Sequence, residues 1–161
     1  MSIKIVPFRQ QHAISFRDLN LAWLEEYFYA EEKDKMLLSN PQASIIDKGG
    51  YIFLAEEHDT VVGCFSFIPF GENKYELGKM AVHQDFQGLK IGQQLLAFAI
   101  DFAKTKGWDA IILYSSTKLP TALHLYRKFG FEDVELEKDL PYARSDVKMV
   151  LQLKTAAVEH I

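Results

Sequence analysis

The sequence predicts a mixed α/β fold: a central, mostly antiparallel sheet with a parallel strand pair, flanked by about four helices. Three observations predict it. Residues 51–82 hold β-branched and aromatic stretches separated by turn residues, as in a meander of hairpins. Apolar residues then recur with helical spacing from Ile91 to just before Gly107. Residues 110–114 form a nearly continuous apolar run, which is typical of a strand buried on both faces. A meander that leads into strand–helix–strand units requires both kinds of strand pairing.

Each element has a local reason. Pro7 ends the first strand, and apolar residues at spacings of three and four predict a helical region from Arg9 to about Glu32. Asn40 followed by Pro41 is typical of a helix start, and Gly49-Gly50 of its end. The expected strands are residues 3–6, 51–56, 61–68, 75–82, 110–114, 131–136 and 147–153. The expected helices are residues 9–32, 41–48, 91–106 and 119–129.

The length of 161 residues fits a single domain over 1–161, with a core at 3–153 and a short tail at 154–161. The net charge of −4 and the lack of a basic stripe argue against nucleic-acid binding. The longest apolar run, residues 95–100, is far shorter than the ~20 residues that span a bilayer. Residues 1–6 lack the apolar region of a signal peptide, so we expect a cytoplasmic protein without membrane partners.

Cysteine and histidine usage gives no sign of a metal site. Cys64 is the single cysteine, so no intrachain disulfide can form, and its apolar surroundings predict a buried core thiol. No histidines pair at metal-ligand spacing, and His12 and His83 are expected at the surface. We therefore predict no metal.

The informative segment is a strand that runs into a loop and then opens a helix. Residues 76–82 form the strand, residues 83–90 the loop, and Ile91 begins the helix. A helix start presents unpaired N–H groups and a partial positive charge, which together bind phosphate. The loop lacks the Gly-Lys-Ser/Thr ending of a Walker motif, and its glycine spacing does not fit the dinucleotide fingerprint.

This segment resembles the acyl-CoA-binding motif of the GCN5-related N-acetyltransferase (GNAT) superfamily. The motif reads Gln or Arg, two residues, Gly, one residue, then Gly or Ala; Gln87 and Gly92 match its ends, and Lys90 stands where the middle Gly is usual. Residues 122–131 resemble the second signature, Ala-x-x-Leu-Tyr-x-x-x-Gly-Phe, with Leu119 in place of a preceding Asn. The two signatures occur in the expected order and separation.

The resemblance implies acetyl-CoA as co-substrate and direct attack by an amine in a ternary complex. It implies that Tyr126 assists the leaving thiolate and that Glu76 is the base, with Asp85 as the second candidate. On spacing alone a core position in its helix is the favoured interpretation of Tyr126, and only the match to the second signature favours the catalytic role. The residues implied in CoA binding are Met80, Ala81, Val82, Gln87, Gly88, Leu89, Lys90, Ile91 and Gly92.

The acceptor side is less specific. Trp23, Tyr27 and Phe28 lie beside glutamates in the first helical region, which commonly walls the acceptor site in the superfamily. Aromatic rings beside carboxylates suit a small amine or a peptide amine. A buried aromatic face with solvated glutamates opposite is an equal alternative. The loop of residues 138–146, with Pro141, is a candidate for the opposite wall.

Two other functions fit the same residues. One is a CoA-binding sensor or assembly domain without catalysis, which the changes at Lys90 and Leu119 favour. The other is a nucleotide-phosphate binder of unrelated chemistry, which should bind ATP or NAD as well as CoA. The sequence does not identify the acceptor amine, the acyl preference beyond acetyl or the oligomeric state, although a homodimer is common for this fold.

Overall fold

A computed structural model describes residues 2–140 and 142–154. The strands are β1 (Lys4–Pro7), β2 (Tyr51–Glu57), β3 (Thr60–Pro69), β4 (Lys74–Val82), β5 (Ala110–Ser115), β6 (Glu132–Val134) and β7 (Val147–Gln152). The α-helices are α1 (Ala13–Tyr27), α2 (Glu32–Ser39), α3 (Ile91–Lys106) and α4 (Pro120–Lys128). Short 3-10 segments lie at Gln10–His12 and Gln84–Phe86, and a π-helical segment lies at Gln42–Ile46.

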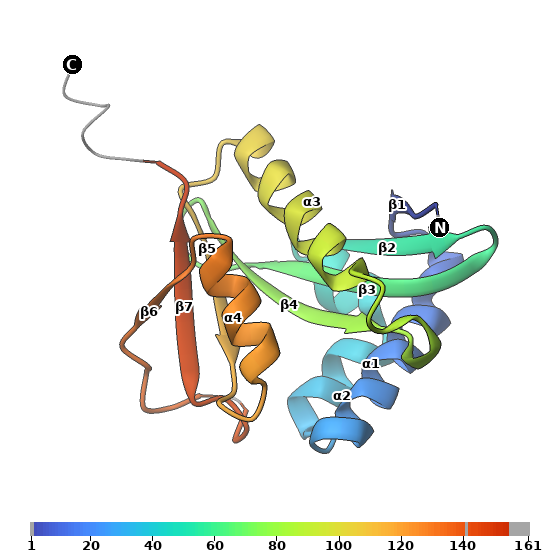
Figure 1. The fold of residues 1–161 in the computed structure, drawn as a ribbon, viewed down its shortest axis with the longest axis horizontal. Coiled ribbons are helices and arrows are strands. Elements are labelled where there is room, and N and C mark those ends of the chain that lie inside the picture. Colours follow the sequence, from blue (N-terminus) through green and yellow to red (C-terminus); the bar gives the residue numbers. More distant parts are fainter. Residues whose placement is uncertain (1, 141, 155–161) are drawn as a thin grey trace. The chain divides into compact units, whose positions relative to one another are not determined.

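The seven strands form a sheet in the order β1-β2-β3-β4-β5-β7-β6 (Figure 1). One neighbouring pair is parallel and the others are antiparallel, which confirms the predicted fold class. Two compact units divide the chain: residues 1–68 with 77–96, and residues 69–76 with the chain from 97 onward. The strand β4 and the helix α3 each run from one unit into the other. Of the predicted tail, 154–161, residues 155–161 lie outside the described part of the chain.

In the first unit, β3 is covered on both faces. A Cβ atom added at Gly63 would lie 3.0 Å from Leu95 Cδ1 and 3.3 Å from Ile91 Cγ2, so the first turns of α3 pack closely on this face. The next residue, Cys64, faces the opposite way, because the Asn20 amide of α1 donates to its sulfur (3.4 Å). The core on that side also includes Phe16, Leu24, Leu37, Leu38, Ile45, Ile52, Leu54 and Ala81.

In the second unit, β7 pairs with β5 on one side and with β6 on the other. Residues 110–113 are all buried, as predicted for the apolar run. The Trp108 and Tyr75 rings stack with their centroids 3.7 Å apart, and Asn73 donates to the Asp109 carboxylate (3.0 Å). These contacts fix the chain entering β5 beside the start of β4.

The N-terminal helical region differs from the prediction. The helix α1 ends at Tyr27, and a separate helix, α2, begins at Glu32, where one continuous helix to about Glu32 was expected. The chain leaves helical geometry at Phe28 (φ −148°, ψ −135°), and the Asp34 carboxylate then accepts the Glu31 N–H (2.9 Å) to start α2. The apolar spacing of α1 therefore gave no sign that this helix ends at Tyr27 and that a second helix begins at Glu32.

The next helix start was predicted correctly. The Asn40 side chain accepts the Ala43 N–H (3.3 Å), and Gly49, at φ +93°, lies at the end of the segment. The expectation for His12 was wrong, because its side chain is buried and its Nδ1 accepts the Arg9 N–H (2.8 Å). Within residues 2–140 and 142–154, no helix is both long and apolar enough to span a membrane.

Candidate active site

The helix start after β4 is built as the sequence predicts. The Lys90 carbonyl accepts the Gln94 N–H (3.1 Å), so the helical hydrogen bonds begin there. The N–H groups of Ile91, Gly92 and Gln93 precede the first helical donor and have no partner within α3. Ile91 is buried, so only its backbone is available to a ligand, whereas Leu89 and Lys90 are exposed.

Two residues of the loop adopt left-handed backbone conformations. Gly88 has φ +82° and Lys90 has φ +62°. Left-handed residues that alternate with right-handed ones turn successive N–H groups toward one concavity, which is a common anion-binding arrangement. Lys90, which stands where a glycine is usual, thus adopts a conformation that glycine favours, and its side chain places a cation beside the helix start.

Gly92 is a glycine that packing does not require. A Cβ atom added there would meet only Val82 Cγ2, at an ordinary 3.9 Å. Glycine costs about 1 kcal/mol relative to alanine inside a helix, so its presence needs another reason. Close approach of a ligand to the backbone is one such reason.

The loop itself is held by His83. The His83 N–H donates to the Val62 carbonyl of β3 (2.7 Å), and its Nδ1 accepts the Asp85 N–H (3.1 Å). The ring also contacts Phe86 edge-on, with the centroids 5.6 Å apart. Asp85 thus shapes the loop through its backbone. Sequence reasoning missed His83, although its place directly after a strand and two residues before Asp85 is a usable signal for a capping side chain.

The end of β4 supplies the remaining predicted CoA-binding residues. Ala81 is buried, whereas Met80 and Val82 are partly buried. The Gln87 side-chain amide reaches back to the Val82 carbonyl (3.5 Å). All the predicted CoA-binding residues, 80–82 and 87–92, therefore belong to the first unit and lie along one continuous strand–loop–helix segment.

Tyr126 and Glu76 belong to the second unit. Burial raises the pKa of the Tyr126 hydroxyl to about 12, and its ring packs edge-on against Phe131, with the centroids 5.9 Å apart. The hydroxyl has no hydrogen-bond partner among the described residues. A phenol with such a pKa stays protonated at neutral pH and is available as a donor.

Glu76 lies near a cluster that the sequence analysis did not identify. Tyr114 donates to Glu137, and Lys148 Nζ lies 2.5 Å from the same carboxylate. The pKa of Tyr114 is raised by burial first, then by Glu137 and, more weakly, by Glu76. The pKa of Glu137 is lowered chiefly by its bond to Lys148. These residues are far apart in sequence, and no local pattern connects them.

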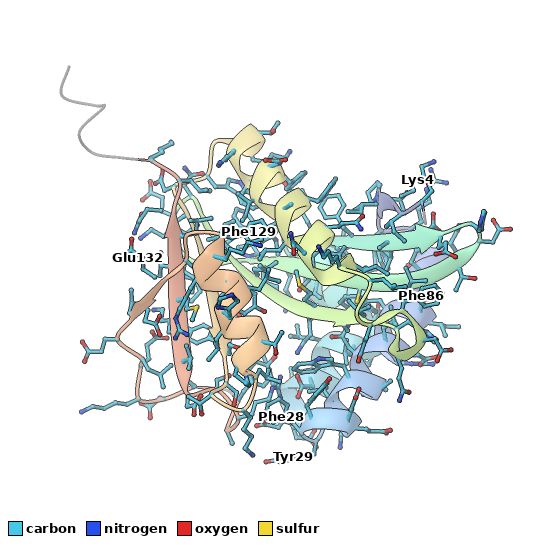
Figure 2. The ribbon with its side chains drawn as sticks, in the orientation of Figure 1. Lys4, Phe28, Tyr29, Phe86, Phe129 and Glu132 are labelled. Atoms are coloured by element: carbon cyan, nitrogen blue, oxygen red, sulfur yellow. The ribbon has the colours of Figure 1, made fainter. Side chains whose placement is uncertain are left out.

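The three aromatic residues predicted for the acceptor site do lie together. The Trp23 ring is 5.4 Å from Tyr27 and 5.7 Å from Phe28, measured between centroids. Tyr27 is 41% exposed; its pKa is raised by burial and by the neighbouring Glu26 carboxylate. Phe28 and the exposed Tyr29 follow the end of α1 (Figure 2). Pro141, in the loop expected opposite, lies outside the described residues. In the part of the chain that the structure describes, no three His, Cys, Asp or Glu side chains form a metal-binding group.

The sequence profile of the acetyltransferase (GNAT) family matches residues 16–131, and the chain therefore belongs to this family. It is 29% identical over 119 residues to an uncharacterized N-acetyltransferase of Schizosaccharomyces pombe, covering 73% of this chain and 70% of that protein. It is 27% identical over 105 residues to the probable N-acetyltransferase camello of Xenopus tropicalis, covering 64% of this chain and 48% of that protein. Family membership and these relatives support acyl transfer from CoA.

Solved structures show the same fold. A GNAT-family acetyltransferase of Staphylococcus aureus superposes with a TM-score of 0.83 at 24% identity, covering 95% of this chain and 100% of that one. The PaiA N-acetyltransferase of Thermoplasma acidophilum, solved in complex with coenzyme A, superposes with a TM-score of 0.74 at 19% identity, covering 94% of this chain and 99% of that one. These structures agree with the profile match over residues 16–131, which confirms the predicted superfamily.

The backbone of Lys90 gives a stability prediction. A left-handed conformation costs a residue with a Cβ atom about 1–2 kcal/mol, and substitution by glycine removes this cost in the folded protein. Part of the gain in stability is lost again, because glycine has greater conformational freedom in the unfolded chain. We expect Lys90→Gly to raise the free energy of unfolding by about 0.5–1 kcal/mol. Lys90→Ala is the matched control, since it removes the same side chain without relieving the backbone. Urea denaturation of both variants measures the difference, and equal stabilities would contradict a strained Lys90.

Proposed function

We propose that the protein is an N-acetyltransferase that moves the acetyl group of acetyl-CoA to a primary amine by direct attack in a ternary complex. The observation that carries this proposal is the start of α3. Its first N–H groups have no helical partner, two of the preceding residues (Gly88 and Lys90) are left-handed, and Gly92 leaves the backbone open. This arrangement is suited to the pyrophosphate of CoA.

In the proposed complex, the N–H groups of residues 89–92 bind the pyrophosphate and Lys90 adds a positive charge. The backbone of Met80, Ala81 and Val82 pairs with pantetheine, and the side-chain amide of Gln87 lies beside Val82. Gly88 supplies the turn between the strand and the helix. The thioester thereby reaches the end of β4.

The reaction requires an oxyanion donor and direct attack by the amine. The Ala81 N–H faces the Cys64 sulfur, where it partly offsets the rise of the thiol pKa to about 12 that burial causes. We therefore assign oxyanion stabilisation to the Met80 N–H. Cys64 stays protonated, is buried and donates to the Lys79 carbonyl (3.4 Å), which argues against an acyl-cysteine intermediate.

Proton transfer completes the proposed cycle. The amine nitrogen attacks the thioester carbonyl carbon, the C–S bond breaks, and the sulfur leaves as a thiolate. Glu76 takes the proton from the amine, and Tyr126 gives its proton to the thiolate. The high pKa of Tyr126 keeps its hydroxyl protonated, so the phenol stabilises the departing thiolate as a hydrogen-bond donor before the sulfur is protonated.

For the acceptor, we propose an amine that meets the aromatic cluster of Trp23, Tyr27 and Phe28. The rings present π-faces, and Glu26 adds a negative charge beside Tyr27. Both features attract an ammonium group before it loses its proton. The name of one structural neighbour includes spermidine N-acetyltransferase, but at 20% identity this likeness concerns the fold.

Binding of CoA depends on the open backbone at Gly92. A helical Cβ tilts toward the N-terminus of its helix, so Gly92→Val directs methyl groups at the proposed pyrophosphate. We expect the dissociation constant for CoA to rise by about tenfold or more. Gln94→Val is the matched control, because it places the same β-branched residue at an exposed position of the same turn. Isothermal titration that gives equal CoA affinity for the folded Gly92→Val protein would place the phosphate elsewhere.

Catalysis depends on the hydroxyl of Tyr126. We expect Tyr126→Phe to lower kcat by roughly 10²-fold, the low end for acid–base catalysis. The melting temperature should hardly change, because the hydroxyl has no described partner and the ring keeps its contact with Phe131. The acid must be protonated, so this contribution persists as pH rises through 10 and is lost only near pH 12.

The measurement is thiol release from acetyl-CoA with an accepted primary amine, beside thermal denaturation and CoA titration of both proteins. A Phe variant that keeps wild-type kcat would remove Tyr126 from the mechanism and leave proton delivery to water. A wild-type protein that binds CoA but acetylates no amine would instead support the non-catalytic CoA-binding alternative.

A further inference from the structure

The strand β4 has an irregular backbone conformation at Lys79, immediately before the residues assigned to pantetheine. We call this irregularity the break in β4, although the chain itself is continuous. Lys79 has φ +51°, which is rare for a non-glycine residue within a strand. A left-handed residue in a strand is typical of a β-bulge, which changes the direction of the residues that follow. The residues that follow are Met80, Ala81 and Val82.

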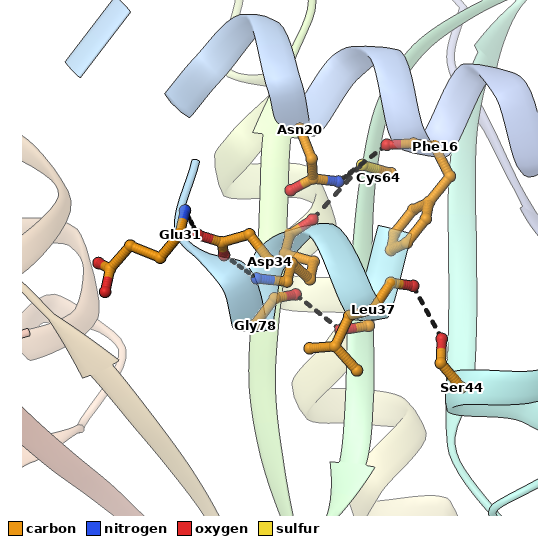
Figure 3. Close-up of polar contacts among 10 residues, drawn as sticks. Phe16, Asn20, Glu31, Asp34, Leu37, Ser44, Cys64 and Gly78 are labelled. Atoms are coloured by element: carbon orange, nitrogen blue, oxygen red, sulfur yellow. Dashed lines mark hydrogen bonds and ion pairs between the residues drawn. The ribbon is translucent and has the colours of Figure 1, made fainter. Parts of the chain in front are cut away.

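Side chains of β3 hold the carbonyls at this break. The Ser66 hydroxyl donates to the Gly78 carbonyl (3.2 Å), and the Cys64 thiol donates to the Lys79 carbonyl (3.4 Å). The Asn20 amide donates in turn to the Cys64 sulfur and to the Phe16 carbonyl (3.0 Å). Figure 3 shows these contacts, which join α1, β3 and β4. Side-chain donors therefore hold the two carbonyls at the point where the strand is irregular.

The Lys79 side chain is fixed as firmly as its backbone. Its Nζ lies 2.6 Å from Asp34 Oδ1, and the two side chains are 7% and 0% exposed. The other oxygen of Asp34 accepts the Glu31 N–H, so the ion pair attaches β4 to the first turn of α2 (Figure 3). A buried ion pair adds less stability than apolar residues of the same size, but it demands one geometry.

We propose that Lys79 and Asp34 are positioning residues for acyl-CoA: their ion pair holds the break in β4 so that the backbone of residues 80–82 meets pantetheine and the thioester. This inference rests on the proposed function. It gives Cys64 a role as a donor to the break, beyond that of a core residue. Both side chains of the Lys79–Asp34 ion pair are buried, so the pair is already formed before CoA binds.

The test removes both charges together. Asp34→Asn/Lys79→Met leaves no unpaired buried charge, keeps an oxygen for the Glu31 N–H, and keeps an unbranched side chain at residue 79. Ile52→Val is the matched control, because it trims the same core cluster without touching the break. We expect the double variant to bind CoA about tenfold more weakly by isothermal titration, with the control unchanged. Peptides covering residues 77–82 should exchange amide hydrogens faster in the double variant only.

Cys64 provides a second, independent pair of variants. Cys64→Ala removes the donor to the Lys79 carbonyl and should weaken CoA binding in the same direction. Cys64→Ser keeps a donor at that position and should restore affinity to within about twofold of wild type. A purely structural role would lower the melting temperature of the alanine variant without changing CoA affinity at temperatures where both proteins are folded.

The outcomes separate this inference from the function on which it rests. If wild-type protein does not bind CoA, the proposed function fails, and the positioning role fails with it. If wild type binds CoA and the folded double variant binds equally well, the positioning role alone is overturned, whether or not exchange at residues 77–82 has changed. Weaker CoA binding together with faster local exchange supports it.

Discussion

The first turns of α3 lie against β3 at Gly63, where the strand carries no Cβ atom. Any Cβ at Gly63 would meet Leu95 at 3.0 Å, so this glycine sets how closely the helix can approach the sheet. The close approach fixes the helix start beside the end of β4. The opposite face of β3 is covered by α1 and α2, so β3 is held between two layers. The unpaired N–H groups of α3 and the backbone of residues 80–82 therefore project from a rigid support, which is what binding by backbone groups requires.

Backbone strain is concentrated around this segment. In the described residues, four non-glycine residues have positive φ. His58 and Asn73 lie in hairpin turns, where such conformations are usual. The other two, Lys79 and Lys90, stand on either side of residues 80–89. A sequence that violates local preference at both ends of one segment, and that holds the chain at the Lys79 end with buried polar contacts, is typical of a functional site.

The sequence predicted most of the fold because its patterns are local. Strand alternation, the Asn40-Pro41 start and the apolar run before Tyr114 each depend on a few neighbouring residues. The separation of α1 from α2 was missed, since it depends on Asp34 accepting one backbone N–H. The Lys79–Asp34 pair and the Tyr114–Glu137–Lys148 cluster join residues that are 11 to 45 positions apart, so only the folded chain could reveal them. A lysine in the left-handed conformation runs against residue preference and has no signature in sequence.

The stoichiometry of a single reaction distinguishes acetyl transfer by direct attack from transfer through an acetylated protein. Wild-type protein is mixed with acetyl-CoA and a panel of primary amines, and both free CoA thiol and acetylated amine are quantified. Direct attack requires one thiol for each acetylated amine, no thiol release without an amine, and no acetyl group on the protein after acetyl-CoA alone. An acetylated protein that hands its acetyl group to a later amine would contradict direct attack. Bound CoA without any acetylated amine would contradict catalysis itself.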